Sequence, residues 1–268
     1  MHQRYRAKGI FIKKQDQDEA DQLLTVFTEQ FGKIEVLAKG IRKITSKLRA
    51  GADVFYLSEI EFIQGKSYKT LTDALLIDKF DSIRQEPEKL QIVLKIVGLL
   101  DQFANQEATD EKLWRFLLQI FEAIENLEIK NSLLNSEGIT ANKASGSWQI
   151  GNWKLEIIRH YSLWNFFAVL GYSPELHHCP LCTRKLLPET FFFVPSEGGV
   201  VCWQCFSAND LKKNGLWFPI KVDVVKTLRV WLSQEWAEAG KVRFGQEAQQ
   251  NLCDISENYL EFLRGNVS

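Results

Sequence analysis

Apolar and polar residues alternate in short runs between residues 5 and 80. The runs are rich in β-branched and aromatic residues, which favour strands over helices. They predict five strands, over residues 8–14, 21–29, 32–40, 53–65 and 68–78. Five strands within about 80 residues, joined by short turns, are typical of a small closed antiparallel barrel, and the oligonucleotide-binding (OB) barrel is the commonest one of this size.

After Pro87 the apolar residues recur at helical spacing, and Pro87 itself is well placed at a helix start. Amphipathic helices are predicted over residues 87–103, 111–128, 154–174, 222–240 and 247–265. The stretch 131–153 is rich in Ser, Asn and Gly and is predicted to be a loop. We therefore expect an α+β protein, strands first and helices second, with a five-stranded OB-fold domain at residues 1–80 and a helical domain at residues 81–268.

Composition changes this picture little. The chain of 268 residues has 45% hydrophobic and 25% charged residues and a net charge of −1, as is ordinary for a globular protein. It contains no apolar run of signal-peptide or membrane-span length, so a cytoplasmic protein without a membrane partner is expected. Cytoplasmic thiols stay reduced, which favours metal or redox roles for paired cysteines over disulfides.

Four of the five cysteines form two Cys-x-x-Cys pairs in the helical half of the chain, within residues 177–206. The pairs are Cys179 with Cys182 and Cys202 with Cys205. Their separation lies in the range expected for a four-thiolate zinc site. The neighbouring His177 and His178 are expected to be exposed loop residues, and Cys253, in a predicted helix, to be a small buried apolar residue.

The segment between the two pairs, residues 189–203, predicts a short hairpin in which Gly198 and Gly199 can supply the positive φ angles of a turn. This is the layout of a zinc ribbon or knuckle. Four thiolates leave no open coordination position, so the predicted Zn²⁺ is structural. Two independent redox pairs are the alternative, although neither pair lies in the βαβ context of a thioredoxin-like motif.

The other distinctive feature is a cluster of positive charge within residues 37–51, a stretch without Asp or Glu. The cluster consists of Lys39, Arg42, Lys43, Lys47 and Arg49. Such clusters bind phosphate backbones through counterion release, and this one joins the third and fourth predicted strands, beside the face with which OB barrels bind single strands. A solvated surface loop is the alternative.

Further basic residues near the N-terminus could extend this path, namely Arg4, Arg6, Lys8, Lys13 and Lys14. Catalytic motifs are absent from the sequence: there is no phosphate-binding loop, no Gly-x-Ser-x-Gly and no His-Glu-x-x-His. Their absence favours a binding protein over an enzyme. A nuclease that holds magnesium with scattered carboxylates stays open as an alternative.

The order of these parts resembles the RecO family of bacterial DNA repair proteins. The resemblance is strongest over residues 8–65, where the segments EADQLLTVFT, GKIEVLAKG and LRAG carry it, and the late four-cysteine knuckle adds to it. It implies an N-terminal OB domain and a C-terminal helical domain with a zinc-binding loop. The DNA-contacting loop then falls on the five basic residues within 37–51, and the metal ligands fall on the four paired cysteines.

The resemblance also implies a function. RecO-like proteins are not enzymes; they bind single- and double-stranded DNA, anneal complementary strands, and work with a RecR-like protein to load recombinase onto DNA coated with single-stranded DNA-binding protein (SSB). They are recruited by the C-terminal tail of SSB, through a site in the helical half that the resemblance does not map to particular residues here. A cytoplasmic, nucleoid-associated protein is expected. A zinc-ribbon transcription or scaffold protein, with the knuckle as its interaction surface, is the alternative from another class.

Overall fold

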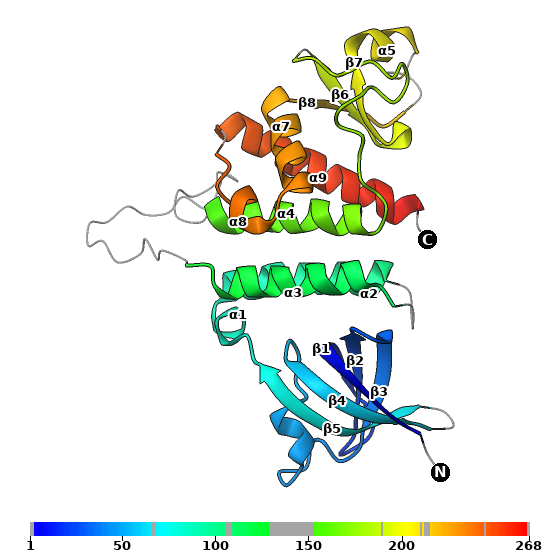
Figure 1. Ribbon diagram of the computed structural model, residues 1–268, viewed down its shortest axis with the longest axis vertical. Helices are drawn as coiled ribbons and strands as arrows, with labels where there is room; N and C mark the ends of the chain where they lie inside the picture. Colours follow the sequence, from blue (N-terminus) through cyan, green and yellow to red (C-terminus); the bar gives the residue numbers. More distant parts are fainter. Residues whose placement is uncertain are drawn as a thin grey trace, which may run out of the picture. The chain divides into compact units, whose positions relative to one another are not determined.

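The chain divides into two units, Met1–Asn126 and Leu127–Ser268. The computed structural model describes residues 3–65, 68–104, 109–128, 153–188, 190–209, 211, 215–243 and 245–266. Strands dominate the start of the chain and helices the rest (Figure 1), which confirms the predicted α+β class. The predicted loop at 131–153 lies almost wholly outside the described residues.

Five strands of the first unit form a closed barrel in the order β1-β2-β3-β5-β4. They are β1 (Arg4–Asp16), β2 (Gln22–Thr28), β3 (Gly32–Ala38), β4 (Leu57–Gln64) and β5 (Lys69–Asp78). All neighbouring strands are antiparallel except β3 and β5, which run parallel. The inward-facing residues of the alternating runs fill the barrel, and the largest of them, Phe11 and Phe62, are fully buried.

The predicted strand at 53–65 is wrong at its start, because strand β4 begins only at Leu57. Phe55 has a φ of 69°, the left-handed conformation, which interrupts any strand. Its ring is nonetheless buried, and its backbone N–H donates to the Phe11 carbonyl at 2.7 Å. Residues 53–56 therefore form a turn that is fastened to β1 and precedes the strand.

Three helices complete the first unit: α1 (Asp81–Gln85), α2 (Pro87–Phe103) and α3 (Glu111–Glu125). The second and third match the predicted helices, with Pro87 in the first turn of α2 and the Asp110 carboxylate accepting a hydrogen bond from the Leu113 N–H at the start of α3. The five-residue α1 is too short for periodicity to predict. Phe80, just before it, also has a positive φ, of 48°.

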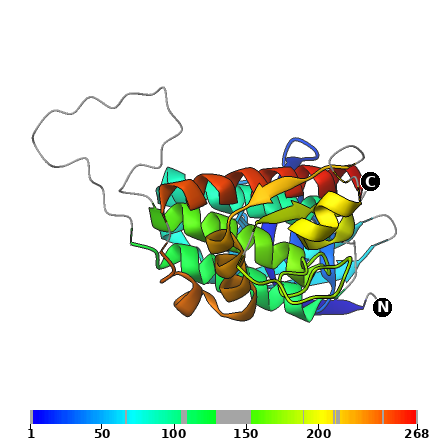
Figure 2. The same cartoon turned by 90° about the horizontal axis from the view of Figure 1, so that it is seen from above.

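The second unit contains the helices α4 (Trp153–Val169), α7 (Val222–Ser233), α8 (Trp236–Ala239) and α9 (Gln246–Asn266). Helices α4, α7 and α9 pack together (Figures 1 and 2). The Trp164 indole N–H donates to the Ser256 hydroxyl at 2.9 Å between α4 and α9. None of the helices in the described parts of the chain has the length and apolar character that a membrane span requires.

The single predicted helix at 222–240 is wrong, since it is two helices, α7 and α8. The chain is extended at Gln234, where φ is −127° and ψ is 149°. The Tyr161 hydroxyl of α4 donates to the Gln234 carbonyl at 3.2 Å, a hydrogen bond that favours the break over a continuous helix. Periodicity along one segment contains no information about this partner.

A three-stranded sheet in the order β7-β6-β8 lies beside these helices within the second unit (Figure 1). The predicted hairpin is confirmed as β6 (Phe191–Val194) and β7 (Gly199–Cys202). Gly198 has the expected positive φ, of 72°, whereas Gly199 does not and is instead needed for a close approach: a Cβ there would lie 2.3 Å from the Glu175 carbonyl oxygen. The sequence did not predict β8 (Phe218–Ile220) or α5 (Trp203–Ala208).

Candidate nucleic-acid interface and metal centre

The loop between β3 and β4 carries all five residues of the basic cluster. Its first part is held to the β1–β2 connection: the Gly40 N–H donates to Asp21 Oδ1 at 2.7 Å, and the Arg42 N–H donates to the Ala20 carbonyl at 3.0 Å. Gly40 has a φ of 66°, which glycine adopts without strain. Ile41 is buried in the barrel core. The loop therefore leaves the barrel in one defined direction.

The middle of the loop is a tight turn followed by one turn of 3₁₀ helix. The Ser46 N–H donates to the Lys43 carbonyl at 3.0 Å, and the 3₁₀ helix η1 follows at Lys47–Ala50. Leu48 returns to pack against the barrel core. At Gly51 the backbone lies so close to β5 that a Cβ would be 2.0 Å from the Ala74 carbonyl oxygen.

The end of the loop is fastened by Asp53 and Arg84. The Arg84 guanidinium donates to Asp53 Oδ2 at 3.0 Å and to the Val54 carbonyl, and it lies 4.8 Å from the centre of the Tyr56 ring. Lys14 donates to the other Asp53 oxygen at 2.7 Å. Burial would raise the pKa of Asp53, but the hydrogen bonds from Lys14, the Val54 N–H and Arg84 outweigh it and hold that pKa below its usual value.

The basic cluster is exposed along this anchored loop. Lys39, Arg42, Lys43, Lys47 and Arg49 are all exposed. Arg42 lies 3.3 Å from Asp16 Oδ2, while the described part of the chain offers no ion-pair partner to the other four. Cations without a carboxylate partner can bind phosphate without first breaking an ion pair.

The N-terminal basic residues differ in this respect. Arg4 and Arg6 both pair with Glu61 at 3.2 Å, and Lys14 pairs with Asp53. A pocket of about 160 Å³ lies beside the Arg6–Glu61 ion pair. It is lined by Arg6, Glu59, Ile60, Glu61, Asp73 and Leu75. Its carboxylates repel phosphate, so this side of the barrel is a poor continuation of the cationic loop.

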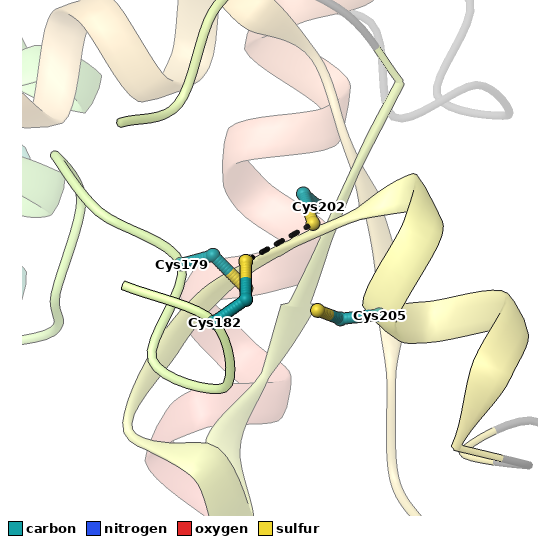
Figure 3. A group of neighbouring side chains, drawn as sticks. All are labelled: Cys179, Cys182, Cys202 and Cys205. Atoms are coloured by element: carbon teal, nitrogen blue, oxygen red, sulfur yellow. Dashed lines mark hydrogen bonds between the residues drawn. The ribbon is translucent and has the colours of Figure 1, made fainter. Parts of the chain in front are cut away.

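The four paired cysteines lie together in the second unit (Figure 3). Their sulfur atoms all lie within 4.8 Å of one another, and Cys182 Sγ is 3.9 Å from Cys202 Sγ. Sulfurs bound at about 2.3 Å to a tetrahedral zinc ion would lie roughly 3.8 Å apart. All five cysteines are free thiols, and two pairs that meet in one cluster are not independent redox pairs. The donor set and its spacing fit a metal ion.

The acidity of these thiols differs within the cluster. The backbone N–H of Arg184 lowers the pKa of the Cys182 thiol to about 6, whereas burial raises the pKa of Cys205 to about 12. Thiolates so close to one another repel, and a divalent cation among them removes that repulsion and lets all four ionise. The cluster can therefore bind a cation, and a cation held by all four sulfurs would leave none of these thiols free to act as a nucleophile.

Backbone hydrogen bonds hold the first pair in a knuckle. The Cys179 N–H donates to the Arg184 carbonyl at 2.9 Å, and the Thr183 N–H donates to the Cys179 carbonyl at 2.8 Å. Glu175 Oε1 accepts from the N–H groups of both His177 and His178, which lower its pKa. Sequence reasoning missed Glu175; an acidic residue shortly before a turn was the only indication.

The remaining candidates lie outside the metal cluster. Both histidines are exposed, as predicted, and neither joins the four sulfurs. Cys253 is only partly buried, and its sulfur lies 3.3 Å from His160 Nε2. Burial raises the pKa of Cys253 to about 11. The fifth cysteine is thus a neutral thiol outside the cluster.

Comparison with known proteins gives matches along both units. Residues 1–80 match the family model described as Recombination protein O N terminal, and residues 151–266 match Recombination protein O C terminal. A DNA repair protein RecO of Syntrophomonas wolfei is 30% identical over 200 residues, covering 75% of this chain and 69% of the relative. The RecO of Dehalococcoides mccartyi strain BAV1 is 27% identical over 248 residues, which cover 92% of this chain and 86% of the relative. The RecO of Moorella thermoacetica is 26% identical over 259 residues, which cover 96% of this chain and 85% of the relative.

Proposed function

The chain belongs to the RecO family of DNA repair and recombination proteins, and from this premise we propose that it is a DNA-binding recombination mediator. It anneals complementary single strands and helps to load recombinase onto SSB-coated DNA. The observation that carries the proposal is the β3–β4 loop, which presents five exposed cations on a well-anchored backbone; among the described residues only Arg42 has an ion-pair partner.

We assign DNA binding to residues 1–80, as an OB-fold domain whose contacts are Lys39, Arg42, Lys43, Lys47 and Arg49. The closed five-stranded barrel and the place of the loop between β3 and β4 support this assignment. The loop neutralises phosphates and leaves base edges open, so two strands can approach one another while bound. Duplex formation is downhill, and annealing therefore requires no nucleotide.

We assign the partner contacts to residues 81–268, the helical domain with a zinc knuckle at 177–206. Cys179, Cys182, Cys202 and Cys205 hold a structural Zn²⁺, which fastens the knuckle to the rest of the domain. The metal supplies stability and no chemistry. The partners are a RecR-like mediator and the C-terminal tail of SSB, and the protein acts in the cytoplasm at the nucleoid.

The test is annealing of two complementary oligonucleotides coated with cognate SSB, followed by fluorescence without nucleotide or magnesium. We expect the full-length protein to accelerate annealing well above the SSB-coated control. An unchanged rate with both coated and naked strands would contradict the proposal. Adding magnesium tests the nuclease alternative, because cleavage products would then appear.

A scaffold protein that binds partners through its knuckle is the second candidate. The observation that favours it is the exposure of three large apolar side chains in and around the knuckle, Leu181, Leu187 and Trp203. Replacing Leu187 and Trp203 by alanine in the full chain separates the two functions. A mediator that binds DNA through its loop keeps DNA binding in this variant. A scaffold that works through its knuckle loses binding to its protein partner.

A further inference from the structure

Ile44 is the most exposed large apolar side chain in the described parts of the chain. It is 92% exposed, whereas Leu75, the next, is 65% exposed. The hydrogen bond from the Ser46 N–H to the Lys43 carbonyl closes a turn with Ile44 and Thr45 at its apex. The loop therefore presents an isoleucine at its tip, in a backbone conformation fixed before any partner binds.

Folding does not explain this isoleucine. The apolar anchors of the loop are Ile41, which is buried in the barrel core, and Leu48, which packs against it. Turn apices favour Gly, Pro, Asn, Asp and Ser, which satisfy the turn geometry, whereas Ile favours strands. An aliphatic side chain held in water contributes no burial to the native state.

The neighbours of Ile44 indicate what it contacts. Arg42, Lys43 and Lys47 lie within three positions of it along the loop, and the loop contains no carboxylate between residues 39 and 49. A partner must therefore combine negative charge with apolar surface at close range. Single-stranded or locally opened DNA has this chemistry, because its phosphates alternate with the apolar faces of unstacked bases.

We propose that Ile44 is a base-contacting residue, an apolar wedge that enters between neighbouring bases while the surrounding cations bind the flanking phosphates. This inference rests on the proposed function of the loop and deepens it. The phosphate contacts supply affinity that is independent of sequence, and the wedge adds a contribution that requires bases to be present. The same contact keeps neighbouring bases apart, which prepares them for pairing with a second strand.

The experiment compares binding of the full-length protein to a labelled oligothymidylate and to an abasic oligonucleotide of equal length, each over a range of salt concentrations. Wild type should prefer the strand with bases. Ile44→Ala should lose roughly tenfold in affinity for that strand, as expected when an aliphatic side chain no longer leaves water, and nothing for the abasic strand. Ile44→Phe should regain the preference, since an aromatic ring stacks on bases.

Leu75→Ala is the matched control, because it removes the next most exposed aliphatic side chain, from strand β5, and leaves the loop intact. An equal loss on both strands, or no loss on either, would overturn the wedge. Binding to vesicles of anionic lipid is measured in parallel. If Ile44→Ala lowered the affinity for these vesicles and not for DNA, the wedge would also be overturned, in favour of contact with a membrane surface. A different result would contradict the proposed function: reversal of the loop charges would leave the salt dependence of DNA binding unchanged.

Discussion

Arg42 Nη1 lies 3.3 Å from Asp16 Oδ2, so one cation of the loop is paired with the end of β1. Asp16 also accepts a hydrogen bond from the Gln22 side chain at 2.9 Å, which orients the carboxylate. Both members of the pair are well exposed, so it contributes little to stability. Its main effect is that Arg42 must leave a carboxylate before it can bind a phosphate.

Asp16→Asn should therefore tighten DNA binding. The variant frees Arg42 and removes a negative charge beside the loop, and the salt dependence of log K should steepen by up to about one unit. The measurement is fluorescence anisotropy with a single-stranded oligonucleotide at several salt concentrations. Asp73→Asn, the same change on strand β5, should leave both quantities nearly unchanged. Weaker binding by Asp16→Asn would mean that the pair supports the bound loop.

Reversal of the loop charges should weaken binding to all DNA sequences. The triple variant Lys39→Glu, Arg42→Glu and Lys43→Glu can no longer neutralise the same phosphates, and the salt dependence should flatten by roughly one unit for each phosphate that is left unbound. The measurement is the same salt titration with two unrelated sequences. A slope identical to that of wild type would remove the loop from the DNA interface.

A control variant with the same change in net charge is available in this chain. Arg115, Lys226 and Lys241 are exposed residues on or beside helices α3, α7 and α8, remote from the loop in sequence. Their reversal to Glu changes the total charge by the same amount. It should lower DNA affinity only slightly, since a local phosphate site and not net charge carries the binding.

The metal centre should bind about one zinc ion per chain. Cys179→Ser or Cys202→Ser removes one of four ligands, and elemental analysis should then find little zinc. The thermal midpoint of the second unit should fall, because metal binding contributes to folding when the site is structural. Cys253→Ser is the control, since its sulfur lies by His160 and not in the cluster. A folded, reduced and metal-free wild-type protein would end the zinc assignment.

Much of the fold was predictable because alternation and helical spacing record which faces are buried. The strand order was not, since the parallel pairing of β3 with β5 closes the barrel through contacts distant in sequence. The turn at Phe55 was missed for a similar reason. Phe is a strand former, and the left-handed φ of Phe55 is compensated by burial and by the hydrogen bond that its N–H donates to the Phe11 carbonyl on strand β1.

The two candidate sites differ in how far the sequence could define them. Cysteine spacing alone predicted one cluster, because two closely spaced pairs can supply the four thiolate ligands of a tetrahedral metal site. The basic stretch predicted a patch of positive charge, but not the ion pair of Arg42 with Asp16 or the exposure of Ile44. The loop that carries both residues is held by hydrogen bonds from the Arg42 N–H to the Ala20 carbonyl and from the Gly40 N–H to the Asp21 carboxylate. Such bonds leave no trace in charge or hydropathy.

Asp53 gives the first unit a pH dependence with a definite sign. Its pKa is held below the ordinary 3.8, so the ionised group stabilises the folded state above about pH 4, and this contribution is lost as the pH falls through the lowered pKa. Asp53→Asn should destabilise the first unit at pH 7 by roughly 1 kcal/mol, since the carboxylate is partly exposed.

The difference in stability between wild type and Asp53→Asn should shrink as the pH falls through the lowered pKa of Asp53, because the carboxyl group then becomes neutral. Hydrogen exchange of peptides that cover residues 53–84 measures this difference within the first unit. Asp73→Asn again serves as the control, because the Asp73 carboxylate accepts a hydrogen bond from the N–H of its neighbour Ala74, whereas Asp53 binds two cations. A difference that grows at low pH would contradict the assigned sign.

Gly51 and Gly98 should respond in opposite directions to alanine. At Gly51, where the loop passes β5, a Cβ would lie 2.0 Å from the Ala74 carbonyl oxygen, so the loop must shift, at a cost of about 1–3 kcal/mol. At Gly98, inside helix α2, a Cβ would meet nothing within 4 Å, and the helix should gain about 0.5–1 kcal/mol. Thermal unfolding of both variants measures this, and DNA binding should weaken only in Gly51→Ala, because only that change displaces the cationic loop. Normal stability and binding in Gly51→Ala would show that the loop does not depend on this close approach.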